Sequence, residues 1–327
     1  MPTQLTSEQV DSIIKARSVL PRAIAVINGK GGQGKTTCTA QLGSLMAEAL
    51  RSSESTGRVL VVDMDPQGNL GLDLGYQGTP GDDGGMSIVQ SVMGPSKLTP
   101  IRDVRPNLDA LPGGDNLEMV PGILVARGAS GSLDDARMSF LKAIADIAPA
   151  YDWILFDCPP LEPMLQDLAL ITARWAVSPV TFDEGARQGL AKVSKRFTKA
   201  AELNPELELL GVIMYAFAKT GGDEEVGQRK RIRAKLEADL RKVGSEAPVF
   251  KQVIRRIDSA AEASRERGQV FTELESATDG PKWWDVRAGR VTGTVLPTER
   301  AATLADEFQA LAGEIFGRVL EKERETA

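Results

Sequence analysis

One short stretch of this 327-residue chain brings glycine, lysine and threonine together at a chemically meaningful spacing. It reads GKGGQGKTT and lies between an apolar run and a segment of helical character. Glycines let the backbone turn tightly and point its N–H groups at an anion, lysine adds positive charge, and a threonine hydroxyl can bind Mg²⁺. The pattern predicts a nucleotide-binding loop made of Gly29, Lys30, Gly31, Gly32, Gln33, Gly34, Lys35, Thr36 and Thr37.

Three aspartates end two other apolar runs. Asp157 closes the run WILFD, and Asp63 and Asp65 close VLVVDMD. Because parallel strands carry their carboxyl ends to one edge of a sheet, we expect all three carboxylates beside the loop. Asp157 and Asp63, with Thr36, are candidate Mg²⁺ ligands, and Asp65 is a candidate for positioning a water. Each aspartate alone could instead be a turn former or helix cap.

The composition excludes several classes of protein. The chain has no histidine and two cysteines, Cys38 and Cys158, far apart in sequence. A disulfide framework, a Cys-rich metal site and a histidine base are therefore excluded, and proton transfer or water positioning falls to carboxylates, lysine or the substrate. The net charge of -6 argues against a uniformly basic nucleic-acid binder. No apolar run approaches the length of a membrane span, so we expect a cytoplasmic protein.

The elements that must position these residues alternate along the chain. AIAVING, RVLVVDMD, YDWILFDCPP, WAVSPVTF and LLGVIMYAF read as strands, and helical segments separate them. This order predicts an α/β protein, in which three layers form a P-loop NTPase fold with a mostly parallel twisted sheet flanked by helices. We expect a short N-terminal helix in residues 1–20 and one domain over 21–327. The domain would end in a docked helix with its apolar face on Leu304, Phe308, Leu311, Ile315, Phe316 and Val319.

Several motifs in this order resemble the ParA/MinD ATPases. KGGQGKTT looks like their deviant Walker A motif, VVDMDPQGNLGLDLG like their switch segment and YDWILFDCPP like their Walker B strand. Further segments, such as VRPNLDALPGG and VFKQVIRRIDSAAEASRERGQVFTEL, follow at the spacing of ParA partitioning proteins over roughly residues 22–275.

The resemblance implies a nucleotide-controlled cycle. It implies an ATPase with ATP and Mg²⁺, a weak intrinsic rate and an ATP-dependent homodimer. Lys30 would cross to the partner subunit's nucleotide, and Asp65 would be critical for hydrolysis. The dimer would bind non-specific double-stranded DNA in the nucleoid, and a ParB-like centromere-binding protein would release it by stimulating hydrolysis. A solvated loop lysine is the plain alternative for Lys30.

A basic segment could supply the DNA contacts. From Arg187 to Arg256 the chain carries 16 Lys and Arg against 9 Asp and Glu. Such a segment can track phosphates, although exposed basic helix faces are commonly just solvated. Ser259 and Ala260 stand where many family members carry an arginine, so Arg255 or Arg256 would have to substitute. The candidate DNA-binding residues are Lys195, Arg196, Lys199, Arg229, Lys230, Arg231, Arg255 and Arg256.

Other functions compete with partitioning. A related ATPase that positions another cargo differs only in its partner, and a metabolic P-loop enzyme would leave the DPQGN and RRIDSAAEA segments unexplained. A membrane-bound relative would end in a basic amphipathic helix, but this tail is acid-rich. A cluster carrier would need paired cysteines, which the chain lacks.

Overall fold

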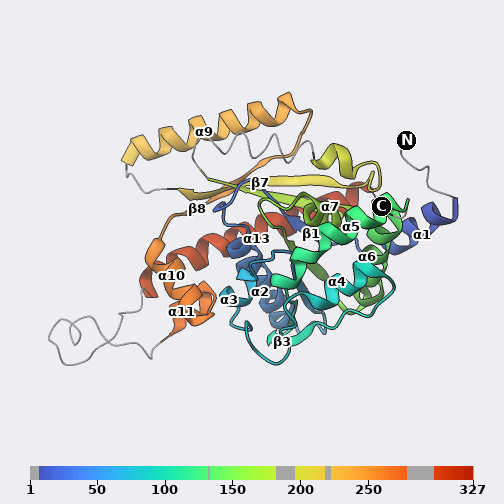
Figure 1. Ribbon diagram of the computed structural model, residues 1–327. Coiled ribbons are helices and arrows are strands. Elements are labelled where there is room, and N and C mark those ends of the chain that lie inside the picture. The colour runs from blue at the N-terminus through green and yellow to red at the C-terminus, as the bar shows by residue number, and fades with distance from the viewer. Residues whose placement is uncertain (1–6, 132, 182–195, 218–221, 278–297, 327) are drawn as a thin grey trace.

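The computed structural model describes residues 7–131, 133–181, 196–217, 222–277 and 298–326. Its centre is an eight-stranded sheet in the order β3-β4-β2-β5-β1-β6-β7-β8 (Figure 1). All paired strands are parallel except β3 and β4. The strands are β1 (Ala23–Val26), β2 (Val59–Asp63), β3 (Ile101–Arg105), β4 (Leu108–Leu111), β5 (Trp153–Asp157), β6 (Trp175–Val180), β7 (Glu208–Phe217) and β8 (Val249–Arg255).

Helices cover both faces of the sheet because successive strand residues point to opposite sides. Along β1, Ala23 and Ala25 join one apolar cluster, whereas Ile24 and Val26 join the other. The first cluster includes α1 (Ser7–Arg17), α4 (Met86–Met93), α5 (Met119–Ala129), α6 (Leu133–Ile147) and α7 (Pro163–Thr172). The second includes α2 (Lys35–Ser52), α3 (Asn69–Asp73), α10 (Asp258–Arg267), α11 (Phe271–Ser276) and α13 (Thr298–Thr326).

A further helix, α9 (Gly222–Lys242), packs separately at one end of the sheet (Figure 1). Its buried residues Ile232, Leu236 and Leu240 share a cluster with Val249 and Val253 of β8. The alternate β8 residues, Phe250 and Ile254, belong to the cluster that contains α13. Hence α9 and α13 cover opposite faces of β8, and the predicted three-layer α/β fold is confirmed.

The structure confirms the five strands expected from the sequence and adds three others. β3 has the charged sequence IRDVR and a largely exposed edge position, and β4 is four residues long. β8 is the opposite edge strand and includes Lys251 and Gln252. Edge strands such as β3 and β8 need no continuous apolar run, and the inner strand β4 is too short to give one, which is why composition did not reveal these three strands. In α13, Leu304, Phe308, Leu311, Ile315 and Val319 are buried, as expected for the docked helix. The composition of residues 276–296 predicts an irregular or hairpin-like stretch, which lies almost wholly outside the described residues.

Candidate nucleotide-binding site

The carboxyl ends of three adjacent strands meet at one point of the sheet. β5 lies between β2 and β1. Asp157 pairs in register with Val26 on one side and with Asp63 on the other. The loop that follows β1 therefore starts beside Asp157, and the switch segment that follows β2 starts beside it too. This brings together the sequence-predicted loop and the three aspartates at a single edge, as expected for parallel strands.

The loop between β1 and α2 has the backbone that its glycines predict. Gly32 and Gly34 have φ angles of 70° and 78°, in the left-handed region that favours glycine. Directly after Gly34 the helix α2 begins, so the first N–H groups of α2 have no intrahelical partner. The Asn28 amide holds the start of the loop, because it donates to the Pro179 carbonyl and accepts the Lys30 N–H at 2.8 and 2.9 Å. Loop and helix terminus together form an anion cradle.

Lys35 lies at the base of this cradle. Its side chain is largely buried, and its Nζ donates to the Lys30 carbonyl oxygen at 3.2 Å. Burial lowers the pKa of the ammonium group, and the nearby Asp157 carboxyl opposes that effect. A bound phosphate would supply negative charge next to this lysine, and so would favour its charged form.

Asp157 is the most unusual group of the site. Both of its carboxylate oxygens are buried, and among the described residues the Thr36 hydroxyl is the one side-chain group close enough to favour the ionised form by hydrogen bonding. Burial raises its pKa to about 7, whereas the Thr36 hydroxyl and the Lys35 ammonium act in the opposite direction. Buried polar atoms are nearly always satisfied, so a carboxylate with so few donors points to a missing ligand. A divalent cation held by Asp157 and Thr36 fits both groups, since Mg²⁺ prefers oxygen ligands.

Asp63 and Asp65 shape the segment between β2 and α3. The two oxygens of Asp63 accept the backbone N–H groups of Asp65 and Leu70 at 2.9 and 3.2 Å. Burial and the neighbouring Asp157 raise the pKa of Asp63 well above its usual value. Asp65 is 8% exposed and accepts the Gln67 N–H at 2.9 Å. Asp63 therefore holds the segment that carries Asp65, and its role as a metal ligand stays a prediction.

A pocket of about 460 Å³ opens beside the loop. Its lining includes Lys30 of the loop, Tyr215 and Ala216 of β7, and Arg255 and Arg256 at the end of β8. The Tyr215 ring covers Gly34 so closely that a side-chain carbon at Gly34 would overlap it. No local sequence pattern marks Tyr215 or Ala216 as part of the site. The space beside the phosphate cradle makes this pocket the candidate site for the nucleotide base.

One ion pair behind the site is not predicted by the sequence analysis. Asp73 of α3 is buried and accepts a hydrogen bond from Arg265 Nε of α10 at 2.8 Å. Burial raises the Asp73 pKa, while Arg265 and the Thr37 side chain lower it. The two residues are 192 positions apart in sequence, and no local pattern could have revealed the contact. Through Asp73, the ion pair connects the switch segment to α10, and the Thr37 side chain joins α2 to the same carboxylate.

Four of the candidate DNA-binding residues form ion pairs with acidic side chains of this chain. Arg196 and Lys199 form ion pairs with the buried Asp167 of α7 at 3.5 and 2.6 Å. Arg255 is half-buried and forms an ion pair with Glu307 of α13. Arg256 is exposed and forms an ion pair with Asp258 at 2.9 Å. Lys195 lies outside the described residues.

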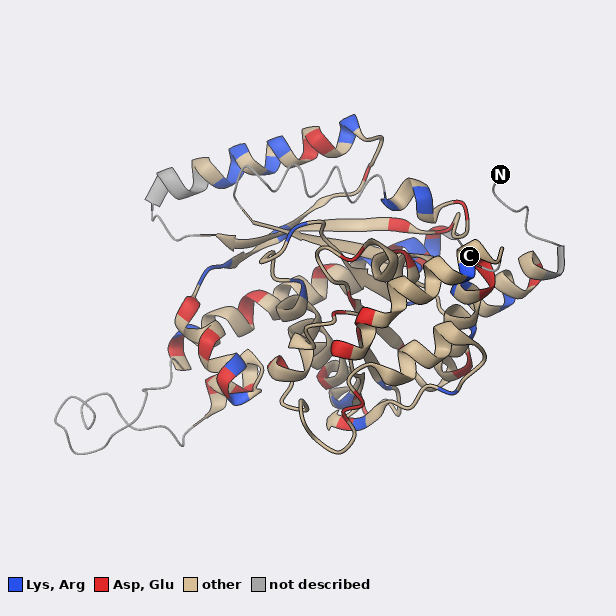
Figure 2. Ribbon diagram, in the orientation of Figure 1, with Lys and Arg blue, Asp and Glu red and all other residues tan. Residues whose placement is uncertain are grey.

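The remaining three candidates lie on α9, where other basic residues join them. Lys230 and Arg231 are exposed, and Arg229 is half-buried. Because Ile232, Leu236 and Leu240 face the sheet, the opposite side of the helix faces solvent. Figure 2 shows basic residues recurring along α9, at the end of the molecule. The exposed basic residues of this helix, here called the α9 face, are Lys230, Arg231, Lys235, Arg241 and Lys242.

Phosphate cradle, buried acid and sheet order together define a P-loop ATPase of the three-layer α/β class. A family model described as an AAA domain matches residues 21–209. The chromosome-partitioning ATPase Soj of Thermus thermophilus is 30% identical over 243 residues, which cover 74% of this chain and 84% of Soj. The chromosome partitioning protein ParA of Myxococcus xanthus is 30% identical over 210 residues, which cover 60% of this chain and 65% of that protein. The chain belongs to the ParA/Soj family of the ParA/MinD superfamily.

Solved structures agree with this assignment at the level of the fold. An ATP complex of a McdA variant from Cyanothece superposes with a TM-score of 0.64 at 18% identity, over 90% of this chain and 96% of McdA. Cobyrinic acid a,c-diamide synthase of Mycobacterium smegmatis, with a bound ATP analogue and magnesium, gives 0.58 at 25% identity, over 78% of this chain and 96% of the synthase. Among the described helices of the present chain, none combines the length and apolar character that a membrane crossing requires.

Proposed function

We propose that this chain is a ParA-type partitioning ATPase that hydrolyses ATP with Mg²⁺ and serves plasmid or chromosome segregation. The observation that carries the nucleotide chemistry is the buried Asp157 carboxylate, which lies beside the loop that contains Lys35 and Thr36 and, among the described residues, has too few hydrogen-bond donors around it to satisfy both oxygens. Family membership carries the biological assignment. Its location would be the cytoplasm, in association with the nucleoid.

Each group of the site has a role in this proposal. The loop amides and Lys35 bind the β- and γ-phosphates, and Thr36 and Asp157 hold Mg²⁺. When bound, the metal ion neutralises charge on the phosphates. Asp63 keeps the switch segment in place through two backbone N–H groups, and so sets the position of Asp65. Asp65 orients the attacking water, which is a suitable role for a carboxylate in a chain without histidine.

Dimerisation on ATP is the second part of the proposal. Lys30 would reach the nucleotide of the partner subunit, where a cation stabilises the triphosphate between two buried faces. Support comes from an apolar residue next to the loop, because Leu161 is 72% exposed and adjoins Pro160, which lies against Gly31. Leu161→Asp is expected to weaken the ATP dimer in light scattering. Ile14→Asp, at a similarly exposed position on α1, should leave the dimer intact.

DNA binding is the third part, and it rests on the α9 face. Two subunits would present two such faces, and basic side chains on a regular helix can follow phosphates without reading bases. Release from DNA would follow hydrolysis stimulated by a ParB-like partner. A related ATPase that positions a different cargo is the main alternative, and it would share every step except the identity of that partner.

The decisive experiment measures binding to random-sequence duplex DNA with ATP, with ADP and without nucleotide, at two salt concentrations. We expect binding only with ATP, loss of affinity at the higher salt and failure of Lys30→Ala to bind. The control is nucleotide binding by the Lys30→Ala monomer, which should be normal. Nucleotide-independent DNA binding, or an ATP dimer of normal stability in Lys30→Ala, would refute the proposed switch. A chain that dimerises on ATP without binding DNA would instead be a cargo-positioning relative.

A further inference from the structure

A second hollow lies at the edge of the sheet opposite the nucleotide site. It forms between α1, the loop after α4 and the last turns of α6, with a volume of about 900 Å³. Its lining includes Val19, just before β1, and Ile147, shortly before β5. The residues that precede parallel strands lie at their amino ends, whereas the phosphate cradle follows β1 at its carboxyl end. The hollow is therefore separate from the site of the proposed ATPase.

A further, smaller hollow adjoins this one, because two residues line both. The neighbour has a volume of about 390 Å³ and shares Ser18 and Val19 with the first. Its far end is bounded by Arg22, which forms an ion pair with Glu323 of α13 at 2.7 Å. A compact small molecule fits one cavity, but two connected hollows of this size suit a linear segment of polypeptide. We call the two together the amino-edge groove.

The floor of the amino-edge groove is apolar and its side chains are small. Ala16, Leu98 and Ala143 are buried at its base, and Val19 is 39% exposed at its side. Small residues on two facing helices leave room for an inserted side chain or helix face. The hydroxyl oxygens of Ser96 and Ser139 are buried there without a hydrogen-bond partner among the described residues.

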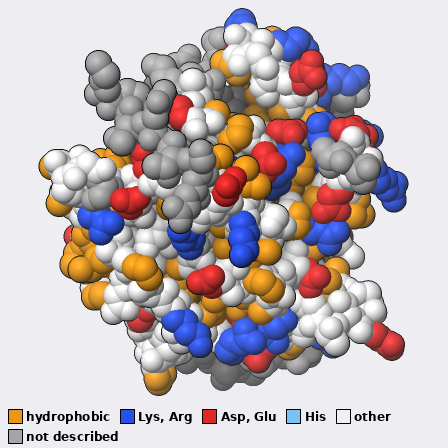
Figure 3. Space-filling view, turned by 90° about the vertical axis from the view of Figure 1, so that its right-hand side faces the viewer, with side chains coloured by type: hydrophobic (Ala, Val, Ile, Leu, Met, Phe, Trp, Pro, Cys, Tyr) orange, Lys and Arg blue, Asp and Glu red, His pale blue; other side chains and the backbone are white. Residues whose placement is uncertain are grey.

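The charge of the rim indicates which charge a bound segment must carry. Lys15, Lys97 and Lys142 are exposed around the larger hollow, and Asp146 is the acidic residue in its lining. None of these lysines forms an ion pair with any residue that the structure describes. The rim of the larger hollow is thus locally basic on a chain whose net charge is -6, whereas Arg22, Asp152 and Glu323 line the smaller hollow. Figure 3 views the molecule from the side on which α1 lies and shows apolar, basic and acidic side chains interspersed there.

We propose that the amino-edge groove binds an acidic, amphipathic segment of a partner protein. The apolar face of that segment would cover Val19 and Ala16, and its carboxylates would pair with Lys15, Lys97 and Lys142. A nucleic acid fits less well, because phosphate binding does not use an apolar floor and the rim carries few cations. Docking here leaves the nucleotide site accessible, so the partner can remain bound throughout the nucleotide cycle.

A random peptide display selection against the full-length chain tests this inference. We expect the recovered peptides to be rich in Asp and Glu, with apolar residues at helical spacing. The highest-ranking peptide, labelled and measured by anisotropy, should bind Lys15→Glu/Lys97→Glu/Lys142→Glu at least tenfold more weakly than the wild-type chain. Val19→Asp should weaken binding as well. The matched control, Lys230→Glu/Arg231→Glu/Lys235→Glu on α9, should bind the peptide normally.

Other results would overturn the inference. Recovery of peptides without acidic enrichment, or equal binding by the groove variant and the α9 variant, would exclude the groove as the docking site. Weaker binding of random duplex DNA or anionic vesicles by the groove variant, with peptide binding unchanged, would assign the lysines to another class of ligand. ATP binding and ATP dimerisation of the groove variant should equal those of the wild type. These two measurements therefore distinguish a failure of the proposed ATPase cycle from a failure of peptide binding in the groove.

Discussion

At the scale of single residues, protonation of Asp157 makes the stability of the folded chain depend on pH. Its pKa is raised to about 7 in the folded chain, chiefly by burial, against a usual value of 3.8. Between pH 3.8 and about pH 7, the Asp157 carboxyl group is protonated in the folded chain and ionised in the unfolded chain. Unfolding therefore becomes easier as pH rises through this window, and the unliganded chain loses stability.

We expect the free energy of unfolding of the apo chain to fall between pH 5 and pH 8. The contribution of Asp157 should be on the order of 2 kcal/mol, since one pKa unit corresponds to about 1.4 kcal/mol and neighbouring groups relax. Asp157→Asn should flatten this dependence and abolish Mg²⁺-dependent nucleotide affinity. Urea denaturation of both chains at pH 5 and at pH 8 measures the free energy of unfolding. An unchanged pH dependence in Asp157→Asn would contradict the assignment.

Lys35 and Asp65 should separate binding from hydrolysis. Lys35→Ala removes the cation at the base of the cradle, so nucleotide binding should be lost. Asp65→Ala leaves the cradle intact and should trap the ATP dimer, because only the positioning of water is removed. Fluorescent nucleotide titration and size-exclusion chromatography distinguish the two variants. An equal loss of ATP affinity in both would disprove the role given to Asp65.

At the scale of elements, one ion pair fixes α3 against α10. Arg265→Ala should destabilise the chain by about 3 kcal/mol, because it leaves the buried Asp73 carboxylate without its cation. Asp73→Asn should cost less, since Arg265 is partly exposed and can be solvated. The exposed pair of Arg256 and Asp258 is the control, and Asp258→Asn should cost under about 1 kcal/mol. Denaturant titration that ranks these variants in another order would refute the argument.

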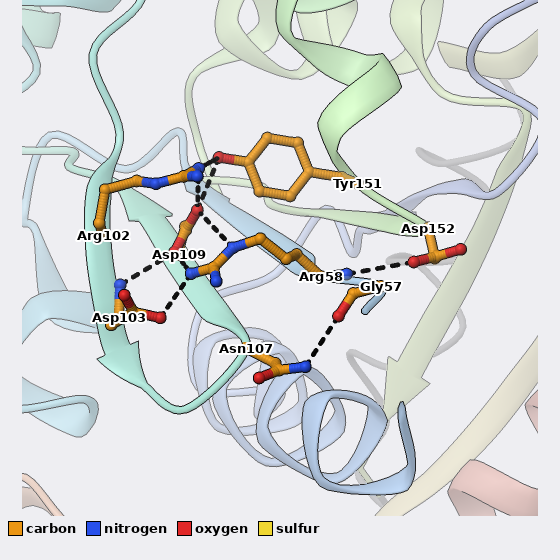
Figure 4. A network of polar contacts seen from close by, with 8 residues as sticks. All are labelled: Gly57, Arg58, Arg102, Asp103, Asn107, Asp109, Tyr151 and Asp152. Atoms are coloured by element: carbon orange, nitrogen blue, oxygen red, sulfur yellow. Dashed lines mark hydrogen bonds and ion pairs between the residues drawn. The ribbon is translucent and has the colours of Figure 1, made fainter. Parts of the chain in front are cut away.

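A second network fixes the edge hairpin of β3 and β4 (Figure 4). The buried Asp109 carboxylate accepts hydrogen bonds from Arg58, Arg102 and Tyr151, and from the Asp103 backbone. Burial opposes ionisation of Asp109, but Arg58 and its other partners outweigh burial and hold the Asp109 pKa below its usual value. This stabilisation is complete above the usual pKa near 4 and is lost as pH falls through the lowered value.

Loss of that carboxylate should therefore loosen the hairpin. We expect Asp109→Asn to destabilise the chain by about 3 kcal/mol at pH 7, because two arginines lose their buried partner. Asp103→Asn is the matched control: its side chain is 60% exposed, and it should cost under about 1 kcal/mol. Thermal unfolding followed by circular dichroism gives both values. If the two variants lose similar amounts of stability, the burial of Asp109 does not strengthen its ion pairs.

At the scale of the whole molecule, charge is distributed unevenly, and the proposed DNA binding would depend on the α9 face. Lys230→Ala/Arg231→Ala should weaken binding of the ATP dimer to duplexes of every sequence. Removing one phosphate-binding cation should reduce the slope of log affinity against log salt by about 0.9. Lys15→Ala/Lys97→Ala removes equal charge at the amino-edge groove and should leave the slope unchanged. Equal effects of both pairs in anisotropy titrations would favour a diffuse electrostatic origin.

The sequence allows the loop, the inner strands and the acidic edge to be predicted, because each depends on a local pattern. Glycine spacing determines the loop, and continuous apolar runs identify β2 and β5. Contacts between distant segments have no such signature, so neither the Asp73–Arg265 pair nor the Asp109 network could be predicted. The basic count over 187–256 is misleading for a similar reason. It combines α9 with Arg196 and Lys199, which form ion pairs with Asp167 instead.

The position of β1 in the sheet has a consequence for synthesis of the chain. β1 is made early, yet its neighbours β5 and β6 begin at residues 153 and 175. A nascent chain must therefore expose the apolar β1 and its phosphate loop until the ribosome has released more than half of the protein. Such non-local pairing slows folding and leaves β1 available to chaperones or to aggregation. Any fragment that stops before β6 should be unable to bind nucleotide, even though it contains every residue of the loop.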